Sequence, residues 1–126
     1  MPPVTRAADK LVTVLQAREQ MERWRAAGER VRFVSAAFDL LDVGTLRALA
    51  EVRAGAERLV AAVWDDAQAR SALGPGRPLL AAADRAMLVA ALRIVDLTLV
   101  SSEHGPEWLG GAPDPVARVR QRLGGS

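Results

Sequence analysis

The chain contains neither cysteine nor tyrosine, and His104 is the single histidine among its 126 residues. Without cysteine, disulfides, thiol catalysis and thiolate metal sites are excluded. One histidine is also too few for a zinc site of the usual nitrogen and sulfur type. No apolar run approaches the length of a membrane span, and the opening MPPVTRAADK lacks the hydrophobic segment of a signal peptide. We therefore expect a soluble, cytoplasmic domain that holds no metal and contacts no membrane.

An excess of charge of either sign is also missing. Seventeen basic residues face fifteen acidic ones, for a formal net charge of +2. The arginines between residues 18 and 32 are interleaved with Glu19, Glu22 and Glu29, a pattern typical of a solvated helix face. We therefore expect no nucleic-acid partner, and nucleic-acid binding is the weakest of the functions that the sequence suggests.

What is present is ordinary globular composition, half hydrophobic and a quarter charged, which predicts one domain over residues 1–126. Short apolar runs without helical periodicity predict buried strands at residues 31–37, 59–64 and 95–100. The glycines and prolines of residues 74–78 predict a loop between the last two of these strands.

Apolar residues at helical spacing predict an N-terminal helix at residues 9–27, a second helix at 44–54 and a C-terminal helix at 114–124. Another helix is predicted to open at Asp84 and to bury a face that includes Leu88. Helices that alternate with apolar strands indicate an α/β fold, a three-layer Rossmann-like parallel sheet with helices on both faces.

In such a sheet, ligands bind beyond the carboxyl ends of the strands. The turns after Ala37 and Trp64 are therefore the first places to look for a site. The turn after Ala37 carries a specific resemblance. Residues 31–45, VRFVSAAFDLLDVGT, resemble the first strand and turn of the nucleotidyltransferase superfamily with a His-x-Gly-His motif, and in particular the cytidylyltransferase-like domain of bacterial heptose-phosphate adenylyltransferases.

Two further collinear blocks, ERLVAAVWDDAQARSALGPGRP and ADRAMLVAALRIVDLTLVSSE, extend this resemblance to residue 103. The family transfers a nucleoside monophosphate from ATP or CTP, with magnesium, to a sugar phosphate or similar acceptor. The resemblance also implies that the first strand lies between the other two, and that the chain is shortened at its C-terminus. It assigns nucleotide-binding positions to Ser35, Ala36, Phe38, Asp39, Gly44, Trp64, Arg77 and Arg85.

The sequence departs from the family where the chemistry lies. The motif is replaced by Asp42-Val43-Gly44-Thr45, so Asp42 and Thr45 stand for its two histidines, and Leu73 stands for a loop lysine. From the residues alone, without the family resemblance, we expect Asp42 to be a helix N-cap and Thr45 to be a residue of the first helical turn.

The remaining positions also have structural interpretations. Arg77 and Arg85 would be surface ion-pair partners, and Trp64 a core or interface anchor whose ring points to the nucleotide side of the sheet. These departures predict a domain that has lost catalysis and serves as a binding or assembly protein, a pseudoenzyme with no required cofactor.

The alternative is an active nucleotidyltransferase with a rebuilt site. It would move AMP or CMP to a sugar phosphate-type acceptor, using Arg77, Arg85 and magnesium held by Asp39, Asp42 or Asp65. In either case we expect a homodimer, and a protein partner or a weakly bound nucleotide. The final helix, with its stripe of Val116, Val119 and Leu123, is one candidate for covering an exposed edge of the sheet.

Overall fold

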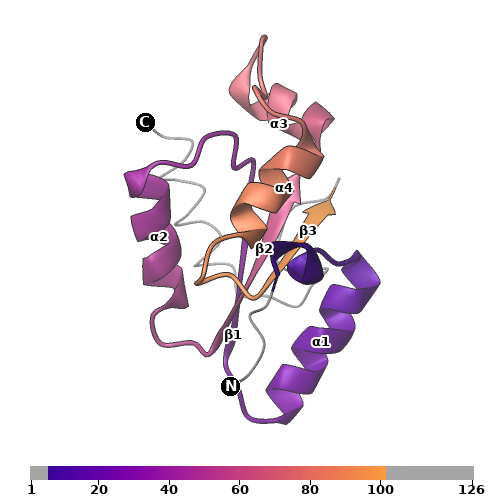
Figure 1. Cartoon of the computed structure of the whole chain (residues 1–126), viewed down its shortest axis with the longest axis vertical. Coiled ribbons are helices and arrows are strands. Elements are labelled where there is room, and N and C mark those ends of the chain that lie inside the picture. The colour runs from indigo at the N-terminus through magenta and orange to yellow at the C-terminus, as the bar shows by residue number, and fades with distance from the viewer. Residues whose placement is uncertain (1–5, 102–126) are drawn as a thin grey trace.

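The structure is a computed structural model and describes residues 6–101. A parallel sheet of β1 (Val31–Ala36), β2 (Arg58–Trp64) and β3 (Leu97–Ser101) forms its centre (Figure 1). The strands stand in the order β1-β2-β3, with Val31 opposite Arg58 and Val60 opposite Leu97. The predicted parallel α/β architecture is confirmed, and the strand bounds lie within two residues of the prediction.

The prediction that the first strand lies between the other two is wrong, because β2 takes the central place. Burial explains the order. Every residue of β2 from Leu59 onward is buried, whereas β1 begins with two half-buried residues and β3 exposes Val100. A strand that is apolar on both faces is the one that gains most from neighbours on both sides.

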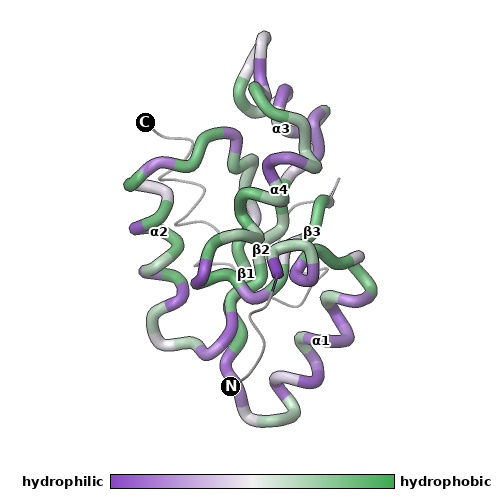
Figure 2. The backbone as a smooth tube through the Cα atoms, in the orientation of Figure 1, coloured by the Kyte–Doolittle hydropathy of each residue, from purple (hydrophilic) through white to green (hydrophobic). Residues whose placement is uncertain are grey.

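The two faces of the sheet are covered by different helices (Figures 1 and 2). α2 (Val43–Arg53) and α4 (Ala82–Ala90) pack on one face, where Leu49 and Val89 meet Val34 and Val63. α1 (Val14–Ala26) packs on the other, where Met21 meets strand residues including Phe33 and Val60. The side chains of successive strand residues point to opposite faces, so both layers bury apolar surface. This confirms the three-layer arrangement.

α1 begins five residues later than predicted. A short 3-10 helix, η1 (Ala7–Lys10), comes first, and the backbone N–H of Val12 then donates to the carbonyl oxygen of Thr98 in β3 at 3.0 Å. Thr13 caps α1 with a capping box: its hydroxyl accepts from the N–H of Gln16 at 3.1 Å, and the Gln16 side chain accepts from the N–H of Thr13 at 2.9 Å. The helix starts where its first free N–H groups find these acceptors.

The structure contains a helix that was not predicted, α3 (Asp66–Leu73), directly after β2. Asp65 caps it by accepting from the N–H of Gln68 at 2.8 Å, and Gly74, at a φ of 99°, ends it. Only Ala69 of this helix is buried, and Leu73, its last residue, is its only large apolar side chain, so no set of large apolar residues marks the helix in the sequence.

α4 is rotated relative to the prediction. The predicted buried position Leu88 is 47% exposed, and the buried residues are Arg85, Ala86, Val89 and Ala90. The helix turns this way because the guanidinium of Arg85 has hydrogen-bond acceptors in the interior, described below. An apolar-periodicity argument places arginine outside and misassigns Leu88, although Val95, at the far end of the same predicted face, is buried and Leu92 packs against the core.

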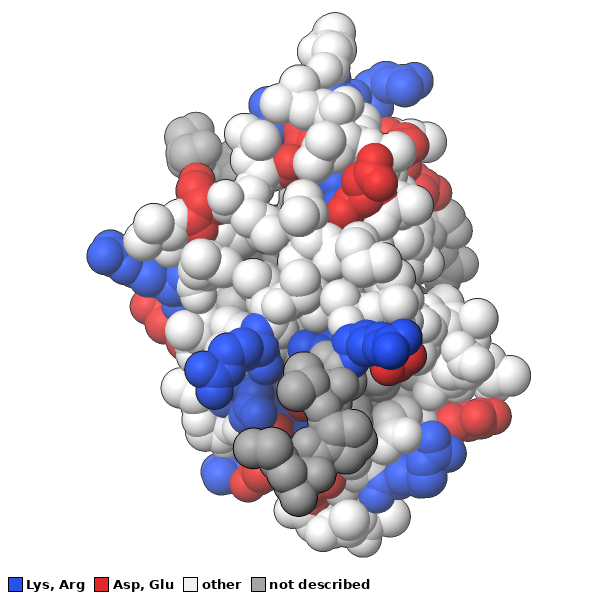
Figure 3. All heavy atoms as spheres, in the orientation of Figure 1, with Lys and Arg blue, Asp and Glu red and all other residues white. Residues whose placement is uncertain are grey.

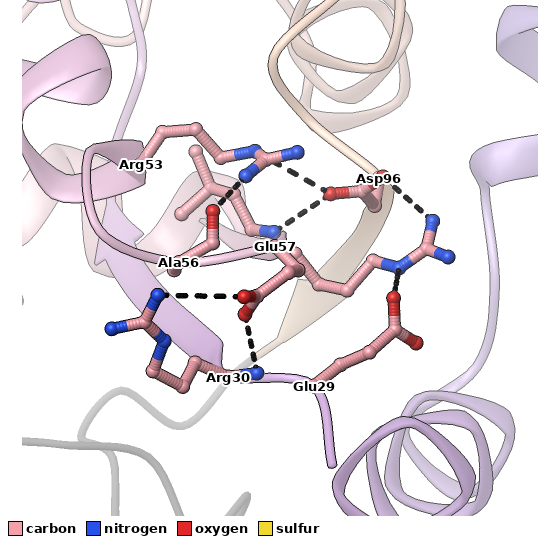
Figure 4. Close-up of polar contacts among 8 residues, drawn as sticks. Glu29, Arg30, Arg53, Ala56, Glu57 and Asp96 are labelled. Carbon is pink, nitrogen blue, oxygen red and sulfur yellow. Dashed lines mark hydrogen bonds and ion pairs between the residues drawn. The ribbon is translucent and has the colours of Figure 1, made fainter. Parts of the chain in front are cut away.

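At the amino ends of the strands, ion pairs join the turns that enter the sheet (Figure 4). The Asp96 carboxylate accepts from the N–H of Leu59 at 2.8 Å and lies 3.4 Å from a guanidinium nitrogen of Arg58. Nε of Arg58 lies 3.1 Å from a carboxylate oxygen of Glu29, and the guanidinium carbon of Arg58 lies 4.8 Å from the centre of the Trp24 ring. Ion pairs therefore hold this edge together, and the opposite edge is the one at which parallel α/β sheets generally bind ligands.

Within residues 6–101, no helix has the length and apolar character needed to cross a bilayer. The predicted helix at 114–124 and His104 lie outside the described residues.

Candidate functional site

The turn after β1 begins with a strained residue. Phe38 has a φ of 53°, in the left-handed region that a bulky residue rarely adopts, yet only 3% of its surface is exposed. The turn sends the Phe38 ring into the core beside Val34 and Leu49, and the next residue, Asp39, is also buried. Strain of this kind persists only where the surroundings enforce it and is often found at functional sites.

Asp39 anchors the loop that precedes α4. One carboxylate oxygen pairs with Nε of Arg77, and the other accepts from the N–H groups of Leu79 at 2.7 Å and Leu80 at 3.4 Å. Burial opposes ionisation of this carboxyl, but the Arg77 guanidinium and the two amides outweigh it and hold the pKa of Asp39 below its ordinary value. The loop therefore lies over the end of β1, and the Asp39 charge is neutralised locally.

Asp42 is the N-cap of α2, the structural role that the sequence predicts for it. Its Oδ1 accepts from the N–H of Thr45 at 2.8 Å and from the Thr45 hydroxyl at 3.0 Å. These two hydrogen bonds, the backbone one first, lower the pKa of Asp42, so it is an anion at neutral pH. Gly44 lies beside this carboxylate, because the first carbon of any side chain at position 44 would be 3.4 Å from Oδ1 of Asp42. The N-terminus of α2 thus already holds a negative charge of its own.

Trp64 lies in a buried cluster at the end of β2. Only 7% of it is exposed, and it packs with Ala37, Ala69 and Leu73. Its indole N–H donates to the hydroxyl of Ser35 at 2.8 Å. Ser35, Trp64 and Leu73, which the sequence analysis selected from different segments, are therefore brought together, and they form a hydrogen-bonded, apolar packing unit.

Arg85 is completely buried, so the prediction that it is a surface ion-pair partner is wrong. Its guanidinium donates to the carbonyl oxygens of Ala37 at 2.5 Å, Trp64 at 2.8 Å and Leu80 at 2.9 Å. It also pairs with the carboxylate of Asp66 at 2.7 Å. A buried guanidinium is tolerated because the ends of both strands supply acceptors for its N–H groups.

Arg77 is the surface ion-pair partner that the sequence predicts. About a third of its side chain is exposed, and its partner is the buried Asp39. It belongs to a loop in which Gly74 and Gly76 both have positive φ, a conformation suited to glycine. Both arginines that the resemblance places near phosphate are therefore engaged with acceptors of the protein itself.

The carboxylates suggested as magnesium ligands are likewise engaged. Asp39 accepts hydrogen bonds from the loop before α4, and Asp42 and Asp65 each cap a helix. In the described part of the chain, no three side chains of the metal-ligating types His, Cys, Asp or Glu come close enough together to hold a metal ion. The three carboxylates suggested for magnesium do not converge on one point.

Sequence reasoning missed three contributors to this edge. Asp66 could have been found from the sequence, because it belongs to an acidic pair directly after the second strand. The N–H groups of Leu79 and Leu80, which donate to Asp39, could not have been found from the sequence, because every residue except proline has the same backbone donor.

Curated proteins that are similar to this chain include bifunctional proteins named HldE. The chain is 39% identical over 118 residues to the bifunctional protein HldE of Acidiphilium cryptum, covering 94% of this chain and 24% of the relative. The bifunctional protein HldE of Koribacter versatilis is 35% identical over 118 residues, with the same shares. The chain thus spans about a quarter of the length of these curated relatives. No family model matches it.

Among solved structures, the chain resembles the lipopolysaccharide core biosynthesis protein from Thermoplasma volcanium. The TM-score is 0.53 at 27% identity, over 59% of each chain. The sequence relatives and this structural neighbour together support an assignment to the cytidylyltransferase-like superfamily, as a nucleotidyltransferase-like domain with an α/β Rossmann-like fold.

Proposed function

We propose that this nucleotidyltransferase-like domain keeps the superfamily's fold but no longer transfers nucleotides, and that it acts as a binding or assembly module. The observation that carries the proposal is the capping of α2 by Asp42. A helix N-terminus at this edge is suited to phosphate, because its free N–H groups and dipole attract an anion. Here a carboxylate of the chain occupies that position and would repel a triphosphate.

The other groups of the edge support the same conclusion. Arg77 and Arg85 would have to leave Asp39 and Asp66 to bind a phosphate, and Trp64 fills the space beside Ser35 with a ring. Loss of one preorganised donor to a transition state lowers the rate by about 10²- to 10³-fold. Losses within one site are not additive, but the two motif histidines and the loop lysine are all replaced here.

Nucleotide binding tests this proposal. By titration calorimetry with ATP and CTP, in the presence of magnesium, we expect only weak binding to the unmodified protein. The double variant Asp42→His with Thr45→His should bind either nucleotide more tightly, because it removes the carboxylate from the helix N-terminus. Asp9→His, which replaces an exposed carboxylate in η1, is the matched control and should leave the affinity unchanged.

Two outcomes would contradict the proposal. One is tight, magnesium-dependent nucleotide binding by the unmodified protein. The other is loss of that binding in Asp42→Ala, which would mean that the carboxylate holds the metal in a rebuilt active site.

A further inference from the structure

Four apolar side chains are exposed around the turn that follows β1. The exposed fractions are 55% for Leu40, 61% for Val43, 60% for Leu79 and 37% for Leu80. They come from two segments that Asp39 joins, because its carboxylate accepts from the N–H groups of Leu79 at 2.7 Å and Leu80 at 3.4 Å. We call these four residues the apolar edge surface. An exposed apolar surface with a polar rim marks an interaction site.

Acidic side chains flank the apolar edge surface. Asp42 at the start of α2 and Asp84 in the first turn of α4 are both exposed. Over the starts of these two helices, Figure 3 shows acidic side chains on either side of uncharged atoms. Arg77 is in the same loop as Leu79 and Leu80, but its charge is balanced by its partner Asp39, and Arg47 lies one turn further along α2. The surface therefore suits an apolar stripe that is flanked by positive charge.

The sequence after the described residues contains such a stripe, in the helix predicted at 114–124. At about 100° per residue, its three large apolar residues fall within about 60° of one another, and they are Val116, Val119 and Leu123. Arg120 and Arg122 fall on either side of this stripe, and Arg118 falls opposite it. Three arginines against Asp114 give the segment a net charge of +2.

From this complementarity we infer that the segment 114–124 docks as a helix on the apolar edge surface of its own chain. The connection is long enough. β3 ends at Ser101 on the same edge of the sheet, where the carbonyl oxygen of Ser101 accepts from the N–H of Asp65 at 3.1 Å. The residues between Ser101 and Asp114 can extend about 40 Å, enough to cross a domain of about 100 residues.

The chain's own segment occupies this surface in preference to the same segment of a second copy. A tether of this kind gives a local concentration of the order of 1 mM, far above micromolar protein in solution. The inference goes beyond the proposed function, because it concerns the apolar surface beside the turn and does not depend on whether the domain transfers nucleotides. Nucleotide takes no part in the test below, so the two proposals can fail separately.

Thiol labelling of the full chain tests the docking. The chain has no cysteine, so Leu79→Cys places a single thiol on the apolar edge surface. N-ethylmaleimide should label it about tenfold faster when Val119→Asp and Leu123→Asp are added, because a helix docked about nine-tenths of the time slows labelling about tenfold. The matched control adds Ala117→Asp and Gln121→Asp, which place the same charges at the same spacing away from the stripe, and it should leave the rate unchanged.

A second thiol position separates release of the segment from loss of the fold. Leu15 is 64% exposed on α1, on the opposite side of the sheet. Leu15→Cys should be labelled at the same rate with and without Val119→Asp and Leu123→Asp. Acceleration at this position as large as at Leu79→Cys would overturn the proposal, because it would come from unfolding.

Two further results would overturn the proposal. One is equal labelling of Leu79→Cys with and without the stripe substitutions, or equal acceleration by the control pair. The other is labelling that slows when the protein concentration is raised about a hundredfold from the micromolar range, because a second copy would then be the occupant. We expect the rate to be independent of protein concentration.

Discussion

The guanidinium of Arg85 holds together the segments that meet at the carboxyl edge of the sheet. It donates to the carbonyl oxygens that end β1 and β2, to the loop before α4, and to Asp66 at the start of α3. The carbonyl oxygens of the buried residues Ala37 and Trp64 would otherwise be left without these hydrogen bonds. Arg85 is thus a structural residue in the position where the family resemblance suggests a phosphate contact.

Replacing Arg85 should therefore damage the fold. We expect Arg85→Leu to lower the free energy of unfolding by about 3 kcal/mol or more, because hydrogen bonds from a charged donor contribute roughly 1.5–3 kcal/mol each. Urea denaturation measures this. Arg70→Leu, at an exposed arginine of α3, should change stability by less than about 0.5 kcal/mol. A loss below about 1 kcal/mol for Arg85→Leu would show that the buried guanidinium is not a structural requirement.

At the scale of elements, hydrogen bonds to the Asp39 carboxylate hold the loop that precedes α4. The ionised carboxylate binds Arg77 and the N–H groups of Leu79 and Leu80, which is why the pKa of Asp39 lies below its ordinary value of 3.8. A carboxyl whose pKa is lowered by folding contributes stability above its unfolded pKa, and this contribution is lost as the pH falls through the folded pKa.

Acid should accordingly loosen this loop. In urea denaturation at pH 7 and at pH 3, we expect the unmodified protein to lose more stability at pH 3 than Asp39→Asn does, since the variant lacks the titrating group. Asp39→Asn should already be less stable at pH 7. Asp9→Asn removes an exposed carboxylate of η1 and serves as the control. An equal acid sensitivity of Asp39→Asn and the unmodified protein would mean that this carboxyl does not couple to folding.

Elements with strong apolar patterns could be predicted from the sequence, and elements defined by polar contacts could not. The three strands follow from short runs that are rich in apolar and β-branched residues and lack helical periodicity. α3 was missed because it buries only Ala69, and the face of α4 was misassigned because Arg85 points inward. The carboxyl ends of the first two strands follow from the sequence as the candidate site, but the contacts of Asp39 depend on loop amides that no sequence pattern reveals.

At the scale of the whole molecule, the two edges of the sheet differ in kind. The amino edge is tied by exposed and half-buried ion pairs around Asp96 (Figure 4). The carboxyl edge, where the superfamily's fold positions its ligands, has its carboxylates and arginines committed to one another and to the backbone. The chain spans about a quarter of the length of its curated relatives, and the proposed loss of catalysis rests on this commitment of the carboxyl edge to packing and capping.

The most direct test of this account is a turnover measurement on the unmodified protein. Pyrophosphate release would be followed with ATP or CTP, magnesium and a panel of sugar phosphates, alongside Asp42→Ala prepared identically. The account predicts that neither protein releases pyrophosphate above the protein-free background, because Asp42 caps a helix and the arginines of this edge are engaged with the chain itself. Release well above background that disappears in Asp42→Ala would contradict it, and would identify Asp42 as part of a working active site.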